Sequence, residues 1–226
     1  MVHSTPLLDT SPGSHSSASQ RRTSQVLWLV RHGESTWNAR GLAQGQDDRA
    51  RLTSRGLRQA RAIAVQLGDR RIRALYASDL RRALQTAAPL ASALRLTVVR
   101  DARLRERCLG ILEGTAAASI SPAVSGISDG RVVNPDACPD GGESLRDFYR
   151  RVAGFASDLA AAGRAGDAGL GEDSEPGWDS GPGSEVAIVA HGGTLRMLTA
   201  CRQGVPVEEM TWDPLANATV LRSPAS

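Results

Sequence analysis

Two histidines of this chain stand at the ends of apolar runs, and a glycine follows each of them. His32-Gly33 comes one arginine after the run Gln25 to Val30, and His191-Gly192 comes directly after the run Glu185 to Ala190. An imidazole serves as a nucleophile or a general base near neutral pH. Parallel neighbouring strands would bring both rings to one sheet edge, where helix N-termini offer free N–H groups to an anion. The pattern favours a phosphate site, although one His-Gly pair alone is more often a plain turn.

Apolar runs alternate with helical patterns over most of the chain. The runs Gln25 to Val30, Arg73 to Ala77 and Glu185 to Ala190 predict strands. The helices are predicted over Thr53 to Leu67, Leu80 to Leu94, Leu145 to Leu159 and Gly193 to Cys201. This order predicts the α/β class, as a three-layer α/β/α sandwich with a mainly parallel central sheet. Ligands of such sheets bind beyond the carboxyl ends of the strands, which is where both histidines stand.

The predicted helices carry apolar residues on one face. In the first helix this face comprises Leu57, Ala60, Ala64 and Leu67, with Thr53 as the N-cap. The helix after Ser144 carries a longer stripe, formed by Leu145, Phe148, Tyr149, Val152, Ala156 and Leu159. Both faces are expected to pack against the sheet.

Composition and length bound the classes of protein that this chain can form. Its 226 residues, 41% of them hydrophobic and 23% charged, are enough for one globular domain. No apolar run approaches the roughly 20 residues of a membrane-spanning helix, and the N-terminus lacks the apolar stretch of a secretory signal. We therefore expect a cytoplasmic protein with no membrane partner.

Cysteines and basic residues exclude further classes. Three cysteines without C-x-x-C spacing favour neither a disulfide framework nor a cysteine zinc site. The 27 basic residues are all arginine but are dispersed, and only 4% of residues are aromatic. A nucleic-acid surface would combine a basic stripe with stacking rings, so no nucleic-acid partner is expected. The sequence carries no signal of oligomeric state.

Two segments lack any helical or strand period. Residues 1–24 are rich in serine, threonine and proline and are predicted to form a disordered tail, which leaves residues 25–226 as the folded domain. The glycine-rich and acidic stretch Gly163 to Glu185 is predicted to be an exposed loop.

Four sequence blocks together resemble the histidine phosphatase superfamily, the phosphoglycerate mutase-like proteins. They follow the family order and are Arg31-His32-Gly33-Glu34-Ser35-Thr36-Trp37-Asn38, Ser78 to Ala87, Leu104-Arg105-Glu106 with Gly110 and Glu113-Gly114, and Ala190-His191-Gly192-Gly193. The resemblance covers residues 26 to about 222. It implies the phosphoglycerate mutase-like fold, in agreement with the element order.

The resemblance also implies roles for individual residues. His32 matches the nucleophile that takes the phosphoryl group. The residues that hold the phosphoryl group are matched by Arg31, Arg82 and His191. Glu106 matches the acid that protonates the leaving oxygen. Further substrate or phosphate contacts are matched by Asn38, Gln44, Gly45, Gly192 and Gly193.

The implied chemistry needs these residue types. Attack by a neutral imidazole forms a phosphohistidine and divides one difficult displacement into two easier steps. Two arginines and a protonated His191 would neutralise the charge on the equatorial oxygens, so neither a metal nor another cofactor is expected. Glu106 would act first as an acid and then as a base for water. A zinc site formed by the two histidines with Glu34, Glu106 and Glu113 is the competing chemistry, but no H-x-x-x-H pair supports it.

The third block distinguishes two classes within the family. Phosphatases transfer the phosphoryl group to water, whereas mutases return it to another hydroxyl group. The mutases resemble E-R-H-Y-G there, whereas this chain reads Glu106-Arg107-Cys108-Leu109-Gly110. The following segment, Thr115 to Pro139, holds one basic residue, Arg131, and the next helix opens with Gly-Gly-Glu-Ser as in the phosphatase branch. These features favour a metal-independent phosphomonoesterase for a small sugar, glycerate or related alcohol phosphate. Within that branch the chain resembles glucosyl-3-phosphoglycerate phosphatase and α-ribazole phosphatase.

Two alternatives stay open at this point. One is phosphoryl transfer of the cofactor-dependent phosphoglycerate mutase type. The other is a non-catalytic phosphate-binding module, although such proteins usually lose His32, Arg82 or Glu106, all of which are present.

Overall fold

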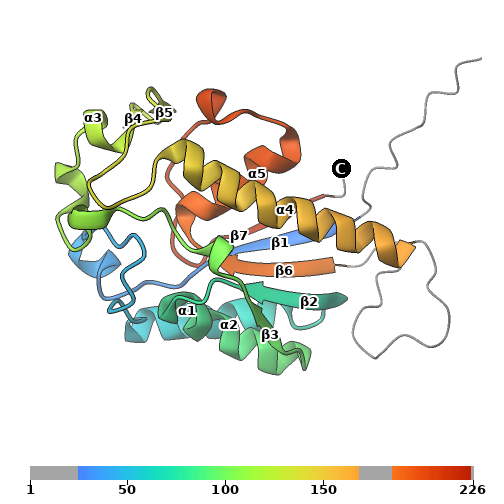
Figure 1. The fold of residues 1–226 in the computed structure, drawn as a ribbon. Coiled ribbons are helices and arrows are strands. Elements are labelled where there is room, and N and C mark those ends of the chain that lie inside the picture. The colour runs from blue at the N-terminus through green and yellow to red at the C-terminus, as the bar shows by residue number, and fades with distance from the viewer. Residues whose placement is uncertain (1–24, 168–184, 225–226) are drawn as a thin grey trace, which may run out of the picture.

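A central sheet forms the middle layer of the protein (Figure 1). The computed structural model describes residues 25–167 and 185–224. Within them the sheet has five strands in the order β3-β2-β6-β1-β7. All neighbours are parallel except β7, which runs antiparallel to β1. The strands are β1 (Val26–Arg31), β2 (Ile72–Ala77), β3 (Val98–Arg100), β6 (Glu185–Ala190) and β7 (Val220–Ser223).

Helices cover both faces of this sheet, which confirms the predicted three-layer α/β/α sandwich. Figure 1 shows α1 (Ser54–Leu67) and α2 (Arg81–Leu94) on one face, and α4 (Leu145–Asp167) and α5 (Gly192–Gln203) on the other. A small cap lies between β3 and α4 along the chain. It contains the short helix α3 (Pro122–Ser125) and the two-stranded ribbon of β4 (Ile127–Ser128) and β5 (Arg131–Val132). In Figure 1 this cap lies at the side where β1 and β6 end.

Helix α1 begins where the sequence predicts, and Ala60, Ala64 and Leu67 of its predicted inner face are buried. The Thr53 side chain accepts a hydrogen bond from the Gly56 N–H at 3.0 Å, which confirms it as the N-cap. The face against the sheet includes Ala60 and Ile63, whereas Leu57 is 41% exposed and its predicted burial is wrong. The reason is Gly56, which packs so tightly on the carbonyl of Glu34 that a Cβ would clash there. Leu57 lies one residue further around the helix and faces outward.

Helix α4 is longer than its apolar stripe. It continues to Asp167, so the predicted loop from Gly163 is wrong for residues 163–167. The remainder of that stretch, like the tail 1–24, lies outside the described residues. Helix α5 likewise begins at Gly192 and ends at Gln203, beyond the predicted Cys201.

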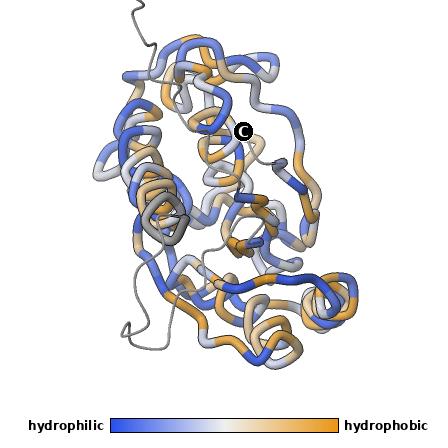
Figure 2. The backbone as a smooth tube through the Cα atoms, turned by 90° about the vertical axis from the view of Figure 1, so that its right-hand side faces the viewer, coloured by the Kyte–Doolittle hydropathy of each residue, from blue (hydrophilic) through white to orange (hydrophobic). Residues whose placement is uncertain are grey.

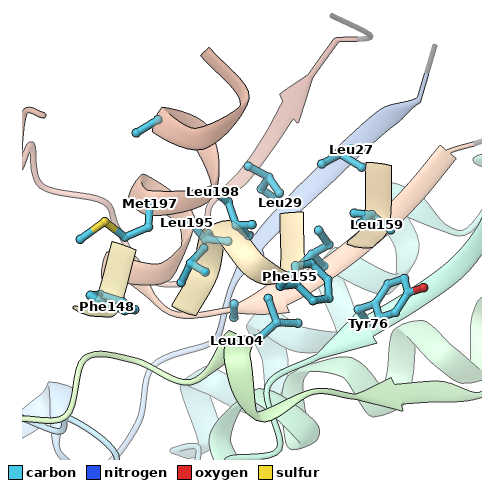
Figure 3. Packing of buried hydrophobic residues seen from close by; sticks show 14 of the residues in the cluster. Leu27, Leu29, Tyr76, Leu104, Phe148, Phe155, Leu159, Leu195, Met197 and Leu198 are labelled. Atoms are coloured by element: carbon cyan, nitrogen blue, oxygen red, sulfur yellow. The ribbon is translucent and has the colours of Figure 1, made fainter. Parts of the chain in front are cut away.

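The core is divided by the sheet into two clusters. The larger one lies under α4 and α5 and contains both phenylalanines of the chain, Phe148 and Phe155. Figure 3 shows Phe155 beside Tyr76 of β2, and their ring centroids are 5.4 Å apart in an edge-to-face arrangement. Hydrophilic and hydrophobic residues alternate along the helices in Figure 2, as amphipathic helices on a sheet require. None of the helices in the described ranges is long and apolar enough to cross a membrane.

The different exposure of Ile63 and Leu57 on α1 predicts unequal costs for two similar substitutions. Ile63→Ala should lower the free energy of unfolding by about 2–4 kcal/mol, because Ile63 is 3% exposed and its removal leaves a cavity. Leu57→Ala removes a similar volume from the solvent-facing side and should cost less than about 1 kcal/mol. Urea unfolding of both variants measures the difference. Equal losses would contradict this placement of the helix.

Candidate active site

The two histidines lie side by side at the carboxyl ends of β1 and β6. These strands pair in parallel with Arg31 opposite Ala190, and the His32 N–H donates to the carbonyl of Ala190 at 3.0 Å. Both rings are buried, and their centroids are 5.1 Å apart. The expectation that the two imidazoles share one sheet edge is therefore confirmed.

His32 is a neutral imidazole with one free lone pair, as a nucleophile requires. Its Nδ1 lies 2.7 Å from the carbonyl oxygen of Gly33, and only a protonated Nδ1 can donate to that acceptor. The lone pair is thereby assigned to Nε2. Burial lowers the pKa of His32 well below its ordinary value, and the positive charges of Arg82 and Arg31 lower it further. The ring is consequently neutral at physiological pH.

His191 is fixed between two side chains. Its Nδ1 accepts from Nε of Arg82 at 3.3 Å, which leaves Nε2 to donate to Oγ of Ser78 at 2.9 Å. Burial lowers the pKa of His191 well below its ordinary value, with further lowering by Arg82 and His32. The sequence-based expectation of a protonated His191 concerns the site with a phosphoryl group bound and stays a prediction. Protonation requires a negative charge close to the ring, such as a phosphoryl group would bring.

Arg82 is fully buried at the centre of the site. Besides His191, its guanidinium donates to the carbonyl of Asp47 at 2.9 Å and to that of Gly45 at 2.7 Å. Burial lowers the pKa of Arg82 to about 10, which still leaves it cationic at neutral pH. The neighbouring Arg81 is exposed, so Arg82 is the member of this pair that belongs to the site.

Arg31 directly follows the apolar run. It lines the cavity that Arg82 and the two histidines also line. Its Nη1 donates to the carbonyl of Leu215. Its Nε is buried and has no hydrogen-bond partner among the described residues. Buried guanidinium donors are normally paired, so an unpaired one at a cavity indicates a ligand that accepts from it.

Glu106 places its carboxylate at the first turn of α5. Oε2 accepts from the N–H of Gly193 at 2.9 Å, and Oε1 accepts from the N–H of Arg107 at 3.0 Å. A Cβ at Gly193 would overlap Oε1, so a side chain at this position would displace the carboxylate. The carboxylate and the two imidazoles line the same cavity.

Two arginines that the sequence did not single out hold the backbone around Glu106. Arg151 of α4 forms a paired contact with the Glu143 carboxylate and donates to the carbonyl of Arg105 at 3.1 Å. Arg107 is buried and donates to the carbonyls of Glu143, Ser125 and Ala137 in the cap. Their partners are mostly backbone carbonyls from distant segments, and no spacing in a sequence signals such contacts.

The remaining predicted site residues line a cavity of about 550 Å³ together with those above. They are Asn38, Gln44, Gly45, Gly192 and Gly193. Asn38 Oδ1 accepts from the Ser35 N–H and from Nδ2 of Asn217, which leaves its own Nδ2 to donate to a ligand. Nδ2 of Asn217 also donates to the His32 carbonyl at 3.3 Å, a contact between distant segments that no sequence motif signals.

Two carboxylates of the alternative zinc set are engaged elsewhere. Glu34 accepts from Oγ1 of Thr53 at 2.7 Å, at the start of α1. Glu113 accepts from the N–H groups of Gln46 and Leu109 at 2.8 and 3.0 Å. Within residues 25–167 and 185–224, no three histidine, cysteine or acidic side chains are grouped as metal ligands.

The fold and this site together define an α/β protein with a cavity whose lining groups suit an anion. Buried guanidinium groups, the first turn of a helix and a neutral imidazole converge at the carboxyl ends of parallel strands. These are the groups that phosphoryl transfer through a covalent intermediate uses.

Comparison with known proteins assigns the chain to a family. The family model described as histidine phosphatase superfamily (branch 1) matches residues 27–170, and the protein belongs to this superfamily. In sequence it is 33% identical over 205 residues to the probable phosphoglycerate mutase GpmB of Yersinia pestis (strain Pestoides F). That match covers 87% of this chain and 83% of the relative.

Solved structures of the same fold carry other names. A mycobacterial glucosyl-3-phosphoglycerate phosphatase in complex with VO3 has 34% identity and a TM-score of 0.70, covering 87% of this chain and 91% of that one. Bacillus stearothermophilus YhfR has 26% identity and a TM-score of 0.68, with coverage of 88% and 90%. The relatives thus include both a phosphatase and a probable mutase.

The two buried imidazoles make the stability of the fold depend on pH. Because their pKa in the folded protein lies below the value of about 6.5 in the unfolded chain, the unfolded state binds more protons below pH 6.5 and stability falls there. One such histidine accounts for about 1.4 kcal/mol between pH 7.5 and 5.5. We expect His191→Gln to remove that part of the wild-type decrease in unfolding free energy, measured with urea at both pH values. Parallel decreases would mean that His191 takes up a proton as readily in the folded protein as in the unfolded chain, so that its pKa is not lowered by folding.

Proposed function

We propose that the protein is a metal-independent phosphomonoesterase that hydrolyses a small sugar, glycerate or related alcohol phosphate through a phosphohistidine. The observation that carries this proposal is the neutral His32, whose Nδ1–H is bound by Gly33 and whose ring lines a cavity with Arg31, Arg82 and Glu106. The guanidinium groups supply the positive charge that a metal ion would otherwise bring. The substrate is a free small molecule in the cytoplasm.

The first half of the reaction transfers the phosphoryl group. The Nε2 lone pair of His32 attacks phosphorus, and the bond from phosphorus to the ester oxygen breaks. Arg31 and Arg82 stabilise the negative charge on the equatorial oxygens. The leaving oxygen takes a proton from Glu106 and departs as the alcohol.

The second half releases phosphate. Glu106, now ionised, accepts a proton from a water molecule as that water attacks the phosphorus of phosphohistidine. The nitrogen–phosphorus bond breaks, which restores the lone pair on His32 and regenerates the protonated Glu106. One carboxyl group therefore serves both halves, held by the N–H groups of Gly193 and Arg107.

The residues of the cap favour transfer of the phosphoryl group to water over its return to a hydroxyl group of the substrate. Arg131, its one basic residue, is exposed and is not among the residues that line the cavity. The cap residues that do line it are Ala117, Ile120, Ser125 and Ile127, none of which is charged. A second phosphate on a bisphosphate intermediate would therefore meet no basic residue from the cap.

Phosphoryl transfer of the mutase type is the second candidate, because the Yersinia relative at 33% identity is named a probable phosphoglycerate mutase. The two activities differ in their products. Incubation with 3-phosphoglycerate yields inorganic phosphate and glycerate from a phosphatase, but 2-phosphoglycerate from a mutase. We expect inorganic phosphate, and isomerisation without phosphate release would overturn the proposal.

Covalent catalysis predicts a trapped phosphoenzyme. Rapid quench of the wild-type protein during turnover of p-nitrophenyl phosphate should give an acid-labile, base-stable phosphoryl label, as a phosphorus–nitrogen bond has. His32→Ala should lose the label and at least about 10³-fold in kcat/KM, because no other nucleophile takes its place. If the variant kept more than a few per cent of the activity, His32 would not be the nucleophile.

Proton donation by Glu106 predicts a dependence on the leaving group. An alkoxide is strongly basic and needs a proton, whereas p-nitrophenolate departs with little help. Glu106→Gln should therefore lose roughly 10²- to 10⁴-fold more kcat/KM on glycerol 3-phosphate than on p-nitrophenyl phosphate. Glu34→Gln is the matched control and should lose equally little on both substrates. Equal losses on the two substrates for Glu106→Gln would remove it from the acid role.

A further inference from the structure

One peptide unit connects the ring of His32 with helix α1. The carbonyl of Gly33 accepts from Nδ1 of His32 at 2.7 Å. The N–H of the same peptide unit belongs to Glu34 and donates to Oε1 of Gln59 on α1 at 2.8 Å. Gln59 is half-buried and is not among the residues that line the cavity. It can therefore act on the reaction only through the backbone that it binds.

The bond to Gln59 directs the Gly33 carbonyl. A peptide unit is planar and trans, so its N–H and its carbonyl point in opposite directions. Because the N–H of Glu34 points at Gln59, the carbonyl points away from Gln59 and toward the His32 ring. One hydrogen bond on α1 thus sets the acceptor that Nδ1 meets.

The preceding peptide unit is fixed at both of its ends. The Gly33 N–H donates to Oγ1 of Thr86 on α2 at 3.0 Å, and the His32 carbonyl accepts from the N–H of Ala218 at 3.1 Å. Thr86 is fully buried, and its hydroxyl donates to the carbonyl of Arg82 at 2.8 Å. The freedom that is left beside the ring is rotation of the next peptide unit about Gly33.

Glycine at this position permits that rotation, because it lacks the Cβ that restricts backbone angles. A Cβ on Gly33 would lie 2.6 Å from the carbonyl oxygen of Gly56 at the start of α1, so a side chain does not fit there. The direction of the peptide unit therefore depends on its own hydrogen bonds, and Gln59 provides the one on the side away from the ring.

The direction of the Gly33 carbonyl decides which nitrogen of His32 carries the proton. A neutral imidazole has one N–H and one lone pair. While the carbonyl accepts from Nδ1, the lone pair stays on Nε2, and that nitrogen can attack phosphorus. If the carbonyl turns away, the proton can move to Nε2, which then has no lone pair for the attack.

We propose that Gln59 is a positioning residue for the reaction: it holds the Glu34 N–H, directs the Gly33 carbonyl to Nδ1 of His32 and so keeps the lone pair on Nε2. This inference rests on His32 as the nucleophile of the proposed function. It assigns a role in catalysis to a side chain of α1 that does not contact the substrate.

Nuclear magnetic resonance of ¹⁵N-labelled histidine measures the tautomer directly, since long-range ¹H–¹⁵N spectra distinguish a protonated ring nitrogen from a bare one. At neutral pH the wild type should show the His32 proton on Nδ1. Gln59→Met should give intermediate shifts for both ring nitrogens, as a mixture of tautomers does. The chain has four histidines, at positions 3, 15, 32 and 191, and the signals that His32→Ala lacks belong to the nucleophile.

Kinetics and phosphate binding separate the tautomer from the rest of the site. Gln59→Met should lose about 10- to 100-fold in kcat/KM on p-nitrophenyl phosphate, because fewer molecules have the lone pair on Nε2. The Kd of inorganic phosphate should stay within about twofold, since Arg31 and Arg82 are unchanged. Gln59→Glu keeps an acceptor oxygen on a side chain of the same length and should restore both the single tautomer and most of the activity.

A control on the same helix tests for general disturbance. Gln66 is exposed, and Gln66→Met should keep the wild-type tautomer and kcat/KM. If Gln59→Met does not fold, Gln59→Asn withdraws the oxygen by one methylene and should still give the mixture of tautomers. An unchanged His32 tautomer in the folded Gln59 variant would overturn the inference, and so would a loss of activity that Gln66→Met shares.

The spectra also distinguish failure of this inference from failure of the proposed function. If Gln59→Met mixes the tautomers but His32→Ala keeps the activity, His32 is not the nucleophile, the proposed mechanism is wrong, and the role of Gln59 in catalysis is overturned with it. If His32→Ala abolishes the phosphoryl label but Gln59→Met keeps a single tautomer, the proposed function stands and only the role of Gln59 is overturned.

Discussion

The burial of Arg82 is the constraint on which the site depends. A guanidinium that is fully removed from water must find acceptors for its donors, because an unpaired buried charge is far more costly than an exposed one. Arg82 finds them in the carbonyls of Gly45 and Asp47 and in Nδ1 of His191. These contacts join helix α2, the loop after β1 and the end of β6 around one charge. They also set the tautomer of His191 and help to keep His32 neutral, so a single buried cation fixes both the shape and the protonation of the site.

The same use of arginine recurs around the cavity. Arg107 and Arg151 donate to backbone carbonyls of the cap and of the segment that carries Glu106, and Arg31 and Arg196 donate to carbonyls of residues 213–215. A planar group with five donors can bind several carbonyls at once, which the single ammonium of lysine does not do with the same geometry. The chain contains no lysine. Arginines that are dispersed along the sequence therefore meet at the site as a framework for loops, and only some of them are left with donors for a ligand.

Much of the fold was predictable because it rests on local periodicity. The apolar runs at β1, β2 and β6 and the amphipathic pattern of α2 are visible in short windows, and their order implies a parallel sheet. Errors arose where a distant contact overrides the pattern. Leu57 fits the helical period of α1 like the buried Ala60, Ala64 and Leu67, but the close contact of Gly56 with the Glu34 carbonyl leaves Leu57 facing outward. The continuation of α4 to Asp167 was missed because the glycines in this stretch favour a loop. The helix continues nevertheless, since its packed N-terminal half already stabilises it.

The sequence by itself determined which residues meet at the site, since two histidines after strands, an arginine on the second helix and Glu106 follow one family pattern. Only the tertiary structure decided their states. The neutrality of His32 and His191 comes from burial and from the charge of Arg82, and Nε of Arg31 is buried without a hydrogen-bond partner among the described residues. A one-dimensional pattern records residue types and spacing. It does not record burial or the direction of a hydrogen bond, and these two quantities decide where protons and unpaired donors lie.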